Sequence, residues 1–577
     1  MHFEDLLSEI GSFGLYQRLL CFLLIPLTTG IVGLTFYVQL FLLAVPPHTC
    51  RQVPPPLPYP TSDVLFHDLS KLLNDTTHDD PVKLPYTCHQ FDPNVTSAYL
   101  VSHEVINVTS LEQLPKPGLD CVSGWQYDTY HMFSTYTSEH DWVCSQAWRP
   151  YVVVTLFWIG NTVGSWLWGI ISDTYGRRPT VVASLAVYGV AGLTSIFISN
   201  FYWFTVLRFL VGTSHHTVSH LPFVLVVEYC GLESRVVPLL TLMISYTVAS
   251  ILTPVLAYVV WDWFTLALIT AVPPLLLLLA FRLIPESSSW LIARGHGEAA
   301  KIQLARVAEV NGHHLPLEMI TQLLSDAGGT GGGESGDQGR NEAVQDESNE
   351  SSIIQAVKYP KLRKNIVLVL LIWMLGCMCY YGHCQNTAHL GSNLFMSYLL
   401  GALVEVPSWC VPWLIHRLGR RRPLSTTFLL SSVAGILYAL VPAESEWLVL
   451  AAALVGRATI TGAYYISLQY CPEVFPTVVR GQGVALAETL GGVAIFLSPS
   501  IVYLGEWQRK APLLVFAGLS GMGGVATLLL PETGGVVLPQ TLQQAELFFR
   551  QAHPPCCRFV NMRSESTKMD SEADDDL

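Results

Sequence analysis

Charged residues are scarce in this sequence. Only 13% of its 577 residues are Asp, Glu, Lys or Arg, whereas 51% are hydrophobic. It also lacks the phosphate-binding loop G-x-x-x-x-G-K-[ST], the zinc-binding pattern H-E-x-x-H and the nucleophile elbow G-x-S-x-G. These absences argue against an enzyme or an ATP-driven pump. The net charge of −13 does not suggest a nucleic-acid partner, and no cofactor or metal is expected.

Long apolar runs, in contrast, are abundant. A helix needs about 20 apolar residues to span a bilayer, and twelve such runs predict an all-α integral membrane protein with twelve transmembrane helices. The lipid bilayer is therefore one expected partner. The runs lie near residues 19–45, 151–172, 180–200, 201–228, 236–260, 263–284, 366–386, 392–415, 424–442, 447–470, 481–504 and 512–530.

Three charged patterns occur twice in the chain. The sequence DTYGRR at 173–178 is echoed by HRLGRR at 416–421, 243 residues later. Glu228 and Arg235 are echoed by Glu473 and Arg480 after 245 residues, and Arg208 is echoed by Arg457 after 249 residues. Near-equal offsets indicate a duplicated unit, as in many transporters, and predict two pseudo-symmetric six-helix bundles. The repeated charges are Asp173, Arg177, Arg178, Arg208, Glu228 and Arg235 in the first half, and Arg420, Arg421, Arg457, Glu473 and Arg480 in the second.

The distribution of basic residues predicts the orientation. Of the 31 Lys and Arg, 22 fall on the side that holds both termini and seven on the other. Because positive charge is retained on the cytoplasmic side of a membrane, both termini are expected in the cytoplasm. The membrane itself is expected to be the plasma membrane. The predicted segments are a cytoplasmic N-terminus (1–18), a first bundle (19–284) with an extracellular loop (46–150), a cytoplasmic linker (285–365), a second bundle (366–530) and a cytoplasmic tail (531–577).

The loop at 46–150 has the composition of an extracellular domain. Its four cysteines, an even number, predict two disulfides in one of three pairings. Three Asn-x-Thr sequons predict glycosylation, and an oligomer formed through this loop is a further expectation. The cysteines are Cys50, Cys88, Cys121 and Cys144, and the sequons are at Asn74, Asn94 and Asn107.

Two carboxylates fall inside apolar runs of the second half. Glu405 lies in the eighth run, two residues before Pro407, and Glu488 lies in the eleventh. Placing an ion in a bilayer costs about 3 kcal/mol or more, so each carboxylate is expected to have a function or a partner that offsets this cost. One interpretation is a site that attracts cations; the other is an intramembrane ion pair, for instance with Arg457.

Aromatic residues supply the second half of a cation site, because the face of an aromatic ring is electronegative. Taken singly, each ring is as well explained by packing. His215 and His216 lie in the middle of the fourth run, where a packing or polar-cavity role is the simpler explanation. The candidate rings are Phe36, Tyr37, Trp373, Tyr380, Tyr381, Tyr464 and Tyr465.

The duplicated charges at the helix ends suggest gating. Ion pairs between neighbouring helices could latch one conformation and release it in another, although simple positive-inside anchoring is the alternative. The intramembrane Arg208 and Arg457 are grouped with these gating residues.

Together, these stretches resemble the major facilitator superfamily and, within it, the organic cation, carnitine and organic anion transporters of solute carrier family 22. The resemblance rests on GIISDTYGRRP, PESSSWL, CVSGWQYDTYHMFSTYTSEHDWVC, YYGHCQNTAHLGSNLFMSYLLGALVEVPSW and YCPEVFPTVVRGQGVALAETLGG. It implies the major facilitator fold, alternating access, and a polyspecific central cavity in which Trp373, Tyr380 and Glu405 match cavity positions.

The chain departs from the family pattern at three places. Gly492 stands where cation carriers tend to have an acid, although Glu488 lies one turn away; His416 and Ser289 replace usual gating-loop residues. The leading hypothesis is a carrier of small organic cations, driven by the substrate gradient and the membrane potential. A carrier of zwitterions or organic anions, and a non-transporting surface receptor, are the alternatives.

Overall fold

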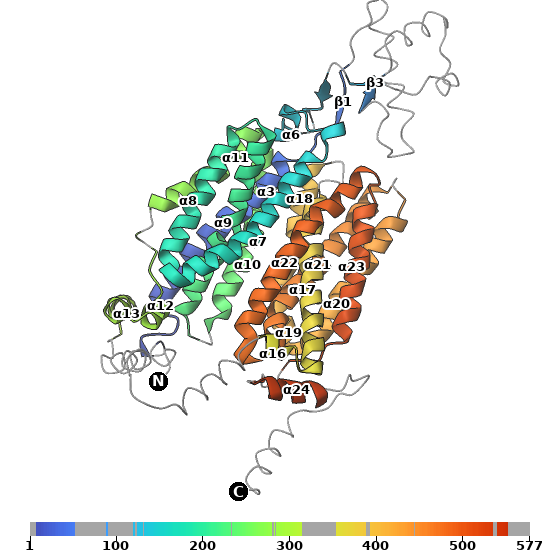
Figure 1. The fold of residues 1–577 in the computed structure, drawn as a ribbon. Coiled ribbons are helices and arrows are strands. Elements are labelled where there is room, and N and C mark those ends of the chain that lie inside the picture. The colour runs from blue at the N-terminus through green and yellow to red at the C-terminus, as the bar shows by residue number, and fades with distance from the viewer. Residues whose placement is uncertain are drawn as a thin grey trace, which may run out of the picture.

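The computed structural model shows two helical bundles side by side (Figure 1). It describes residues 7, 9–51, 88–90, 119–121, 124–130, 132–231, 234–279, 282, 284–313, 353–387, 393–442, 445–534, 539 and 541–551. All statements about contacts below refer to these residues. The three sequons lie outside them.

Each bundle is built from the six long helices that the apolar runs predict. The first bundle contains α3 (Ile25–Leu42), α7 (Arg149–Tyr175), α8 (Arg177–Ile196), α9 (Phe201–Glu228), α10 (Val236–Val260) and α11 (Trp263–Leu279). The second contains α17 (Pro360–Asn386), α18 (Leu394–Leu403) with α19 (Val411–Leu418), α20 (Arg421–Leu440), α21 (Glu446–Val474), α22 (Arg480–Tyr503) and α23 (Ala511–Leu528).

Ten helices of the described chain are long and apolar enough to cross a membrane. The other two predicted spans correspond to α9, which carries Arg208 and three histidines, and to α11, which has only 17 residues. The first span begins before α3, with α2 (Leu15–Leu19) and a π-helical turn at Leu20–Leu24. The eighth span is interrupted by a 3₁₀ segment, Val406–Cys410, where Pro407 lacks the N–H needed to continue the helix.

Glycines let helices α7 and α9 approach closely. A Cβ at Gly164 would lie 1.8 Å from the carbonyl oxygen of Thr213, and one at Gly212 would lie 2.1 Å from that of Phe157. Such backbone contact through small residues is a usual way to pack membrane helices, since lipid supplies no hydrophobic driving force between them.

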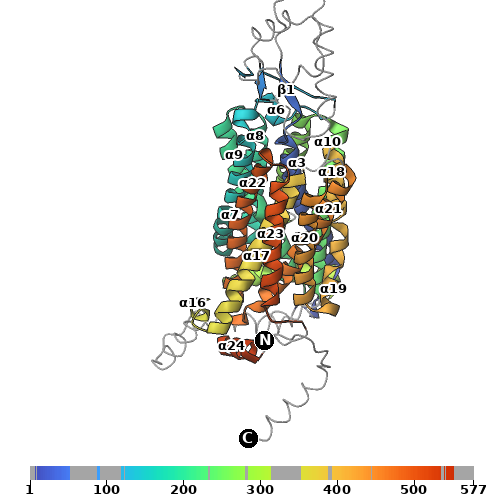
Figure 2. The same cartoon turned by 90° about the vertical axis from the view of Figure 1, so that its right-hand side faces the viewer.

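Two short antiparallel strand pairs lie at one end of the bundles, called here the disulfide end (Figure 2). Strand β1 (His48–Cys50) pairs with β4 (Trp125–Tyr127), and β2 (His89–Gln90) with β3 (Leu119–Asp120). The short helix α6 (Tyr136–Glu139) lies beside them. Of the three pairings open to the sequence, the structure has Cys50–Cys121 and Cys88–Cys144.

Short helices cover the opposite end, called the linker end. They are α12 (Ser288–Ala293), α13 (Gly297–Asn311), α16 (Ile353–Ala356) and α24 (Leu542–Gln551). Helix α13 is fastened to the chain ahead of the first span, because the Asn311 side chain donates to the carbonyl of Ile10 and accepts from the backbone of Tyr16, both at 2.9 Å.

Candidate functional site

Seven aromatic side chains from both bundles meet in one group. The closest pairs are Tyr380 with Tyr464, whose ring centroids are 4.7 Å apart, and Trp158 with Tyr381, at 4.6 Å. The second pair joins the two halves. This interhalf aromatic cluster consists of Phe36, Trp158, Trp373, Tyr380, Tyr381, Tyr464 and Tyr465.

The structure therefore brings together the rings that the sequence singled out, since Tyr37 also packs on Phe36, with centroids 5.0 Å apart. Trp158 was missed. A tryptophan in an apolar helix with several others, such as Trp166 and Trp168, does not stand out without the fold.

Glu488 lies at the edge of this cluster. It is close enough to Tyr464 and Cys377 to interact with them electrostatically, and its neighbour Gly491 packs against Trp373, where an added Cβ would lie 2.6 Å from Nε1. The Glu488 side chain is exposed, and it has neither a hydrogen bond nor an ion pair with any described residue. It is an intramembrane carboxylate that is free to meet a cation.

Glu405, in contrast, is paired. Arg457 donates through Nη2 to Glu405 Oε1 at 2.8 Å, and the two side chains are 3% and 0% exposed. Arg457 Nη1 also donates to Thr387 at 2.9 Å, and the Tyr380 hydroxyl donates to Glu405 Oε2 at 3.5 Å. The structure thus contains the ion pair that the sequence left as an alternative for Glu405, and Arg457 is not free to hold an anion.

Contacts between the halves close the disulfide end. Phe41 of α3 packs on Phe395 and Tyr398 of α18, with centroids 5.7 and 4.7 Å apart. On the other side, Tyr151 of α7 packs on Tyr503 at 5.0 Å and donates to Glu506 at 3.1 Å. None of these residues was predicted from the sequence, because aromatic residues near helix ends are also typical of membrane interfaces.

The duplicated charges form one corner at the linker end of each half. In the first half, Arg177 contacts Asp173 at 2.8 Å and Glu228 at 3.2 Å. In the second, Arg420 contacts Glu473 at 3.1 Å. Both networks lie within a single half, so in this conformation they fix the helices of each bundle to one another.

Two further glutamates complete these corners and were missed. Glu286 accepts the backbone N–H of Arg177 at 2.7 Å, and Glu532 accepts that of Arg420 at the same distance. Gly176 and Gly419 turn the chain there with positive φ. The sequence does mark both glutamates, because a Pro-Glu pair follows the last span of each half, at 285–286 and 531–532.

The remaining predicted gating residues make other contacts. The backbone N–H of Arg178 also reaches Glu286, and the Arg421 guanidinium donates to the carbonyl of Leu528. Arg480 donates through Nε to the carbonyl of Phe475 at 3.4 Å, and Arg235 precedes α10 at the linker end. Arg208 lies away from both corners, inside the first bundle.

Comparisons with known proteins give a consistent result. The family model described as "Major Facilitator Superfamily" matches residues 145–499. The chain is 27% identical to an organic cation transporter protein of Drosophila melanogaster, over 96% of each chain. It is 28% identical to the organic cation/carnitine transporter 2 of Homo sapiens, over 94% of this chain and 93% of the relative.

A third relative is the carcinine transporter of Drosophila melanogaster, 29% identical over 96% of this chain and 81% of the relative. Among solved structures, the inward open conformation of the xylose transporter XylE from E. coli has a TM-score of 0.54 and 13% identity, and the match covers 91% of this chain and 99% of that one. The fold and the family that the motifs predicted, solute carrier family 22, are thereby confirmed.

Proposed function

Because this chain belongs to the Major Facilitator Superfamily, and the relatives named above are transporters and not enzymes, we propose that it moves small organic cations by alternating access. The driving forces are the substrate gradient and the membrane potential. The printed names of the relatives, organic cation, carnitine and carcinine transporters, support an organic solute.

One observation carries the choice of a cation: Glu488 is an unpaired carboxylate beside the interhalf aromatic cluster. A cation that leaves water needs compensating charge and polarizable surface. Glu488 supplies the charge, and Trp373 and Tyr464, stacked with centroids 5.6 Å apart, supply electronegative ring faces. Glu488 thereby takes the role of the acid missing at Gly492.

The charge balance argues against the rival substrates. An organic anion or the carboxylate of a zwitterion would need a basic partner in the cavity. Arg457 is the buried arginine described in the second bundle, and its charge is already neutralised by Glu405 at 2.8 Å. The unpaired charge beside the aromatic cluster is therefore negative.

The contacts between the halves indicate how access alternates. Phe41, Phe395, Tyr151 and Tyr503 close the disulfide end, whereas each charged corner at the linker end stays within its own half. Rigid halves that rock about the aromatic cluster would open one end while closing the other. We place the disulfide end outside the plasma membrane and both termini in the cytoplasm. The five segment boundaries and the glycosylated sequons are proposed as the sequence predicts them. We also propose that the protein self-associates through the extracellular loop.

Uptake into cells at a clamped membrane potential tests the proposal. We expect tetraethylammonium uptake to increase as the interior becomes more negative, because each 100 mV adds about 2.3 kcal/mol per charge. Uptake of p-aminohippurate, an anion, and of carnitine, a zwitterion, should be much lower. Glu488→Gln should raise the apparent KM for the cation about tenfold or more, corresponding to about 1.4 kcal/mol.

The matched control is Thr489→Val on the same helix. Thr489 is exposed and its hydroxyl donates to the carbonyl of Ala485 at 2.8 Å, so this variant should transport like the wild type. Anion or carnitine uptake that is indifferent to Glu488 would favour the rival carrier. Normal surface expression with no uptake of any of the three probes would contradict transport and favour a receptor.

A further inference from the structure

Arg208 is a buried cation without a partner. Its side chain lies in the interior of the first bundle, 5% exposed, and its Nε has no hydrogen-bond partner. No described residue forms an ion pair or a hydrogen bond with it. The Phe204 ring centroid lies 5.0 Å from Cζ, and Tyr136 and Tyr188 are close enough to interact electrostatically. A ring face or a phenol attracts the charge without neutralising it.

Carboxylates do not reach this site from the helices around it. Helices α3, α8 and α11 contain no acidic residue, and α9 contains only Glu228. Glu228 is 20 residues from Arg208 along the same helix, about 30 Å away, and it pairs with Arg177. Glu139 of α6 accepts instead from Nε1 of Trp263, at the start of α11, at 2.7 Å.

The second bundle shows what is missing. Arg457 occupies the duplicated position and is neutralised by Glu405 and hydrogen-bonded to Thr387. Leaving one charge of such a pair buried alone costs about 3–5 kcal/mol in soluble proteins. Among the residues that the structure describes, Arg208 has no such acid, so its counter-charge is absent from the helices that surround it.

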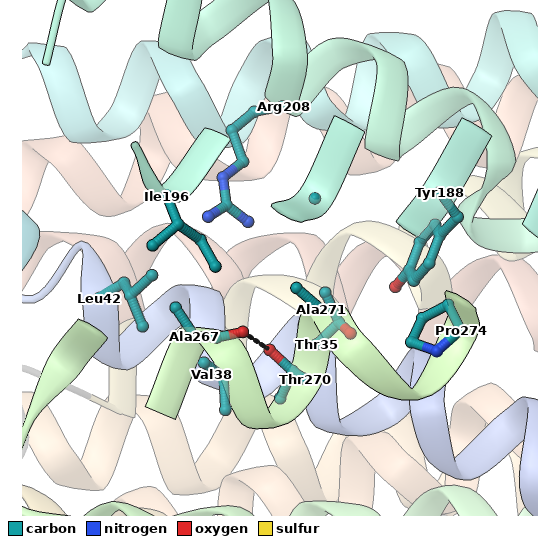
Figure 3. A pocket seen from close by; sticks show the side chains of 11 residues that line it. Thr35, Val38, Leu42, Tyr188, Ile196, Arg208, Ala267, Thr270, Ala271 and Pro274 are labelled. Carbon is teal, nitrogen blue, oxygen red and sulfur yellow. Dashed lines mark hydrogen bonds between the residues drawn. The ribbon is translucent and has the colours of Figure 1, made fainter. Parts of the chain in front are cut away.

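The Arg208 guanidinium points into a cavity between four helices, α3, α8, α9 and α11 (Figure 3). Apolar side chains, including Val38, Leu42 and Ile196, form most of its wall, and the free space holds one water-sized or ion-sized group. None of the residues that line this cavity belongs to the interhalf aromatic cluster.

The polar groups in the wall limit the ligand. The hydroxyls of Thr35 and Thr270 donate to the carbonyls of Ile31 and Ala267, at 2.9 and 3.0 Å. The Tyr188 hydroxyl lies 3.4 Å from His215 Nδ1 and also interacts with the Thr35 hydroxyl. The donor group aimed at the cavity is therefore the Arg208 guanidinium, and a positive charge facing a small space suits an anion.

We propose that this cavity is a structural binding site for one small inorganic anion, and chloride is the monovalent anion chosen to test it. Arg208 supplies the positive charge and most of the donors. The anion neutralises the first bundle at the position where Glu405 neutralises the second. The site does not depend on the identity of the transported substrate.

The test measures thermal stability and chloride binding of the purified full-length protein. Wild type is compared in sodium gluconate and in sodium chloride at a constant ionic strength of about 0.15 M, and binding of radioactive chloride is measured in parallel. We expect the melting temperature to rise by a few degrees in chloride, because a ligand that binds only the folded state stabilises it. Arg208→Gln should lose this response, with at least about a tenfold loss of chloride affinity.

Two further variants sharpen the test. Thr270→Glu places a carboxylate in the cavity, so its melting temperature should be as high in gluconate as in chloride, whether or not Arg208→Gln folds well. Arg51→Gln removes an exposed arginine at the disulfide end and should respond to chloride like the wild type. Absence of a chloride effect and of saturable binding in the wild type would overturn the proposal, and so would a chloride response that survives in Arg208→Gln or Thr270→Glu.

Discussion

Arg457 on α21 and Glu405 at the break of the eighth span form a fully buried ion pair, with Nη2 and Oε1 2.8 Å apart. The pair removes one acid and one base from the charge balance of the central cavity. Glu488 in the second bundle and Arg208 in the first, in contrast, form no ion pair with a described residue. These two residues give the halves opposite charge and, in our proposals, different ligands.

Breaking the pair should destabilise the protein. Glu405→Gln leaves Arg457 buried and uncompensated, so we expect a loss of about 3–5 kcal/mol of stability, seen as a lower melting temperature of the detergent-solubilised protein. The double variant Glu405→Gln with Arg457→Met removes both charges and should recover much of the loss. If the double variant were as unstable as the sum of its single changes, the pair would not be coupled.

The two charged corners depend on a glycine each. Gly176 and Gly419 have φ of 105° and 79° with extended ψ, a region that costs a side chain about 1–3 kcal/mol. An added Cβ would also lie 2.6 Å from Glu286 Oε2 and 2.7 Å from Glu532 Cδ. We therefore expect Gly176→Ala and Gly419→Ala to lower the melting temperature by similar amounts.

Gly169→Ala is the matched control for these glycines. Gly169 lies within helix α7, and a Cβ added there would meet nothing within 4 Å outside its own helix, so alanine should be neutral or slightly stabilising at this position. Equal destabilisation by all three substitutions would show that the corners carry no special constraint.

Much of the fold could be predicted from the sequence because lipid imposes a simple rule on composition. A spanning helix must be apolar over about 20 residues, and α3, α7 and α20 follow that rule closely. Helix α9 follows it less closely, since Arg208 and its histidines interrupt the apolar run at 201–228, and the repeat that relates Arg208 to Arg457 adds support for this span.

The site was harder to predict because pairing is a three-dimensional property. Glu405 and Glu488 look alike in the sequence, each a single acid in an apolar run, and only the fold shows that Arg457 reaches one of them and not the other. Likewise, Glu286 and Glu532 reach Arg177 and Arg420 from 109 and 112 residues away. A search for repeated Pro-Glu pairs would have found both.

The disulfide pairing can be checked chemically. A non-reduced proteolytic digest should contain the linked peptides of Cys50 with Cys121 and of Cys88 with Cys144, identified by mass spectrometry. Removing one bond through Cys50→Ser with Cys121→Ser should cost about 2–4 kcal/mol, mainly because the unfolded loop gains freedom. Cys410→Ser, which removes an exposed free thiol, should change neither stability nor the pattern of linked peptides; peptides joining Cys50 to Cys88 or Cys144 would contradict the structure.

Glu546 should control whether helix α24 stays docked at the linker end. Its side chain, 4% exposed, accepts the backbone N–H groups of Lys361 and Leu362 at 3.0 and 2.9 Å, and a carboxylate at the N-terminus of α17 is favoured by the free donors and by the helix dipole.

Glu546→Ala leaves those donors without a partner, so α24 should detach and trypsin should cleave after Arg550 faster, at unchanged protease concentration. Gln543→Ala, at an exposed position of the same helix, should be cleaved at the wild-type rate. Because α24 also buries Leu542, Ala545 and Phe549, equal cleavage of Glu546→Ala and the wild type would mean that these apolar contacts alone hold the helix in place.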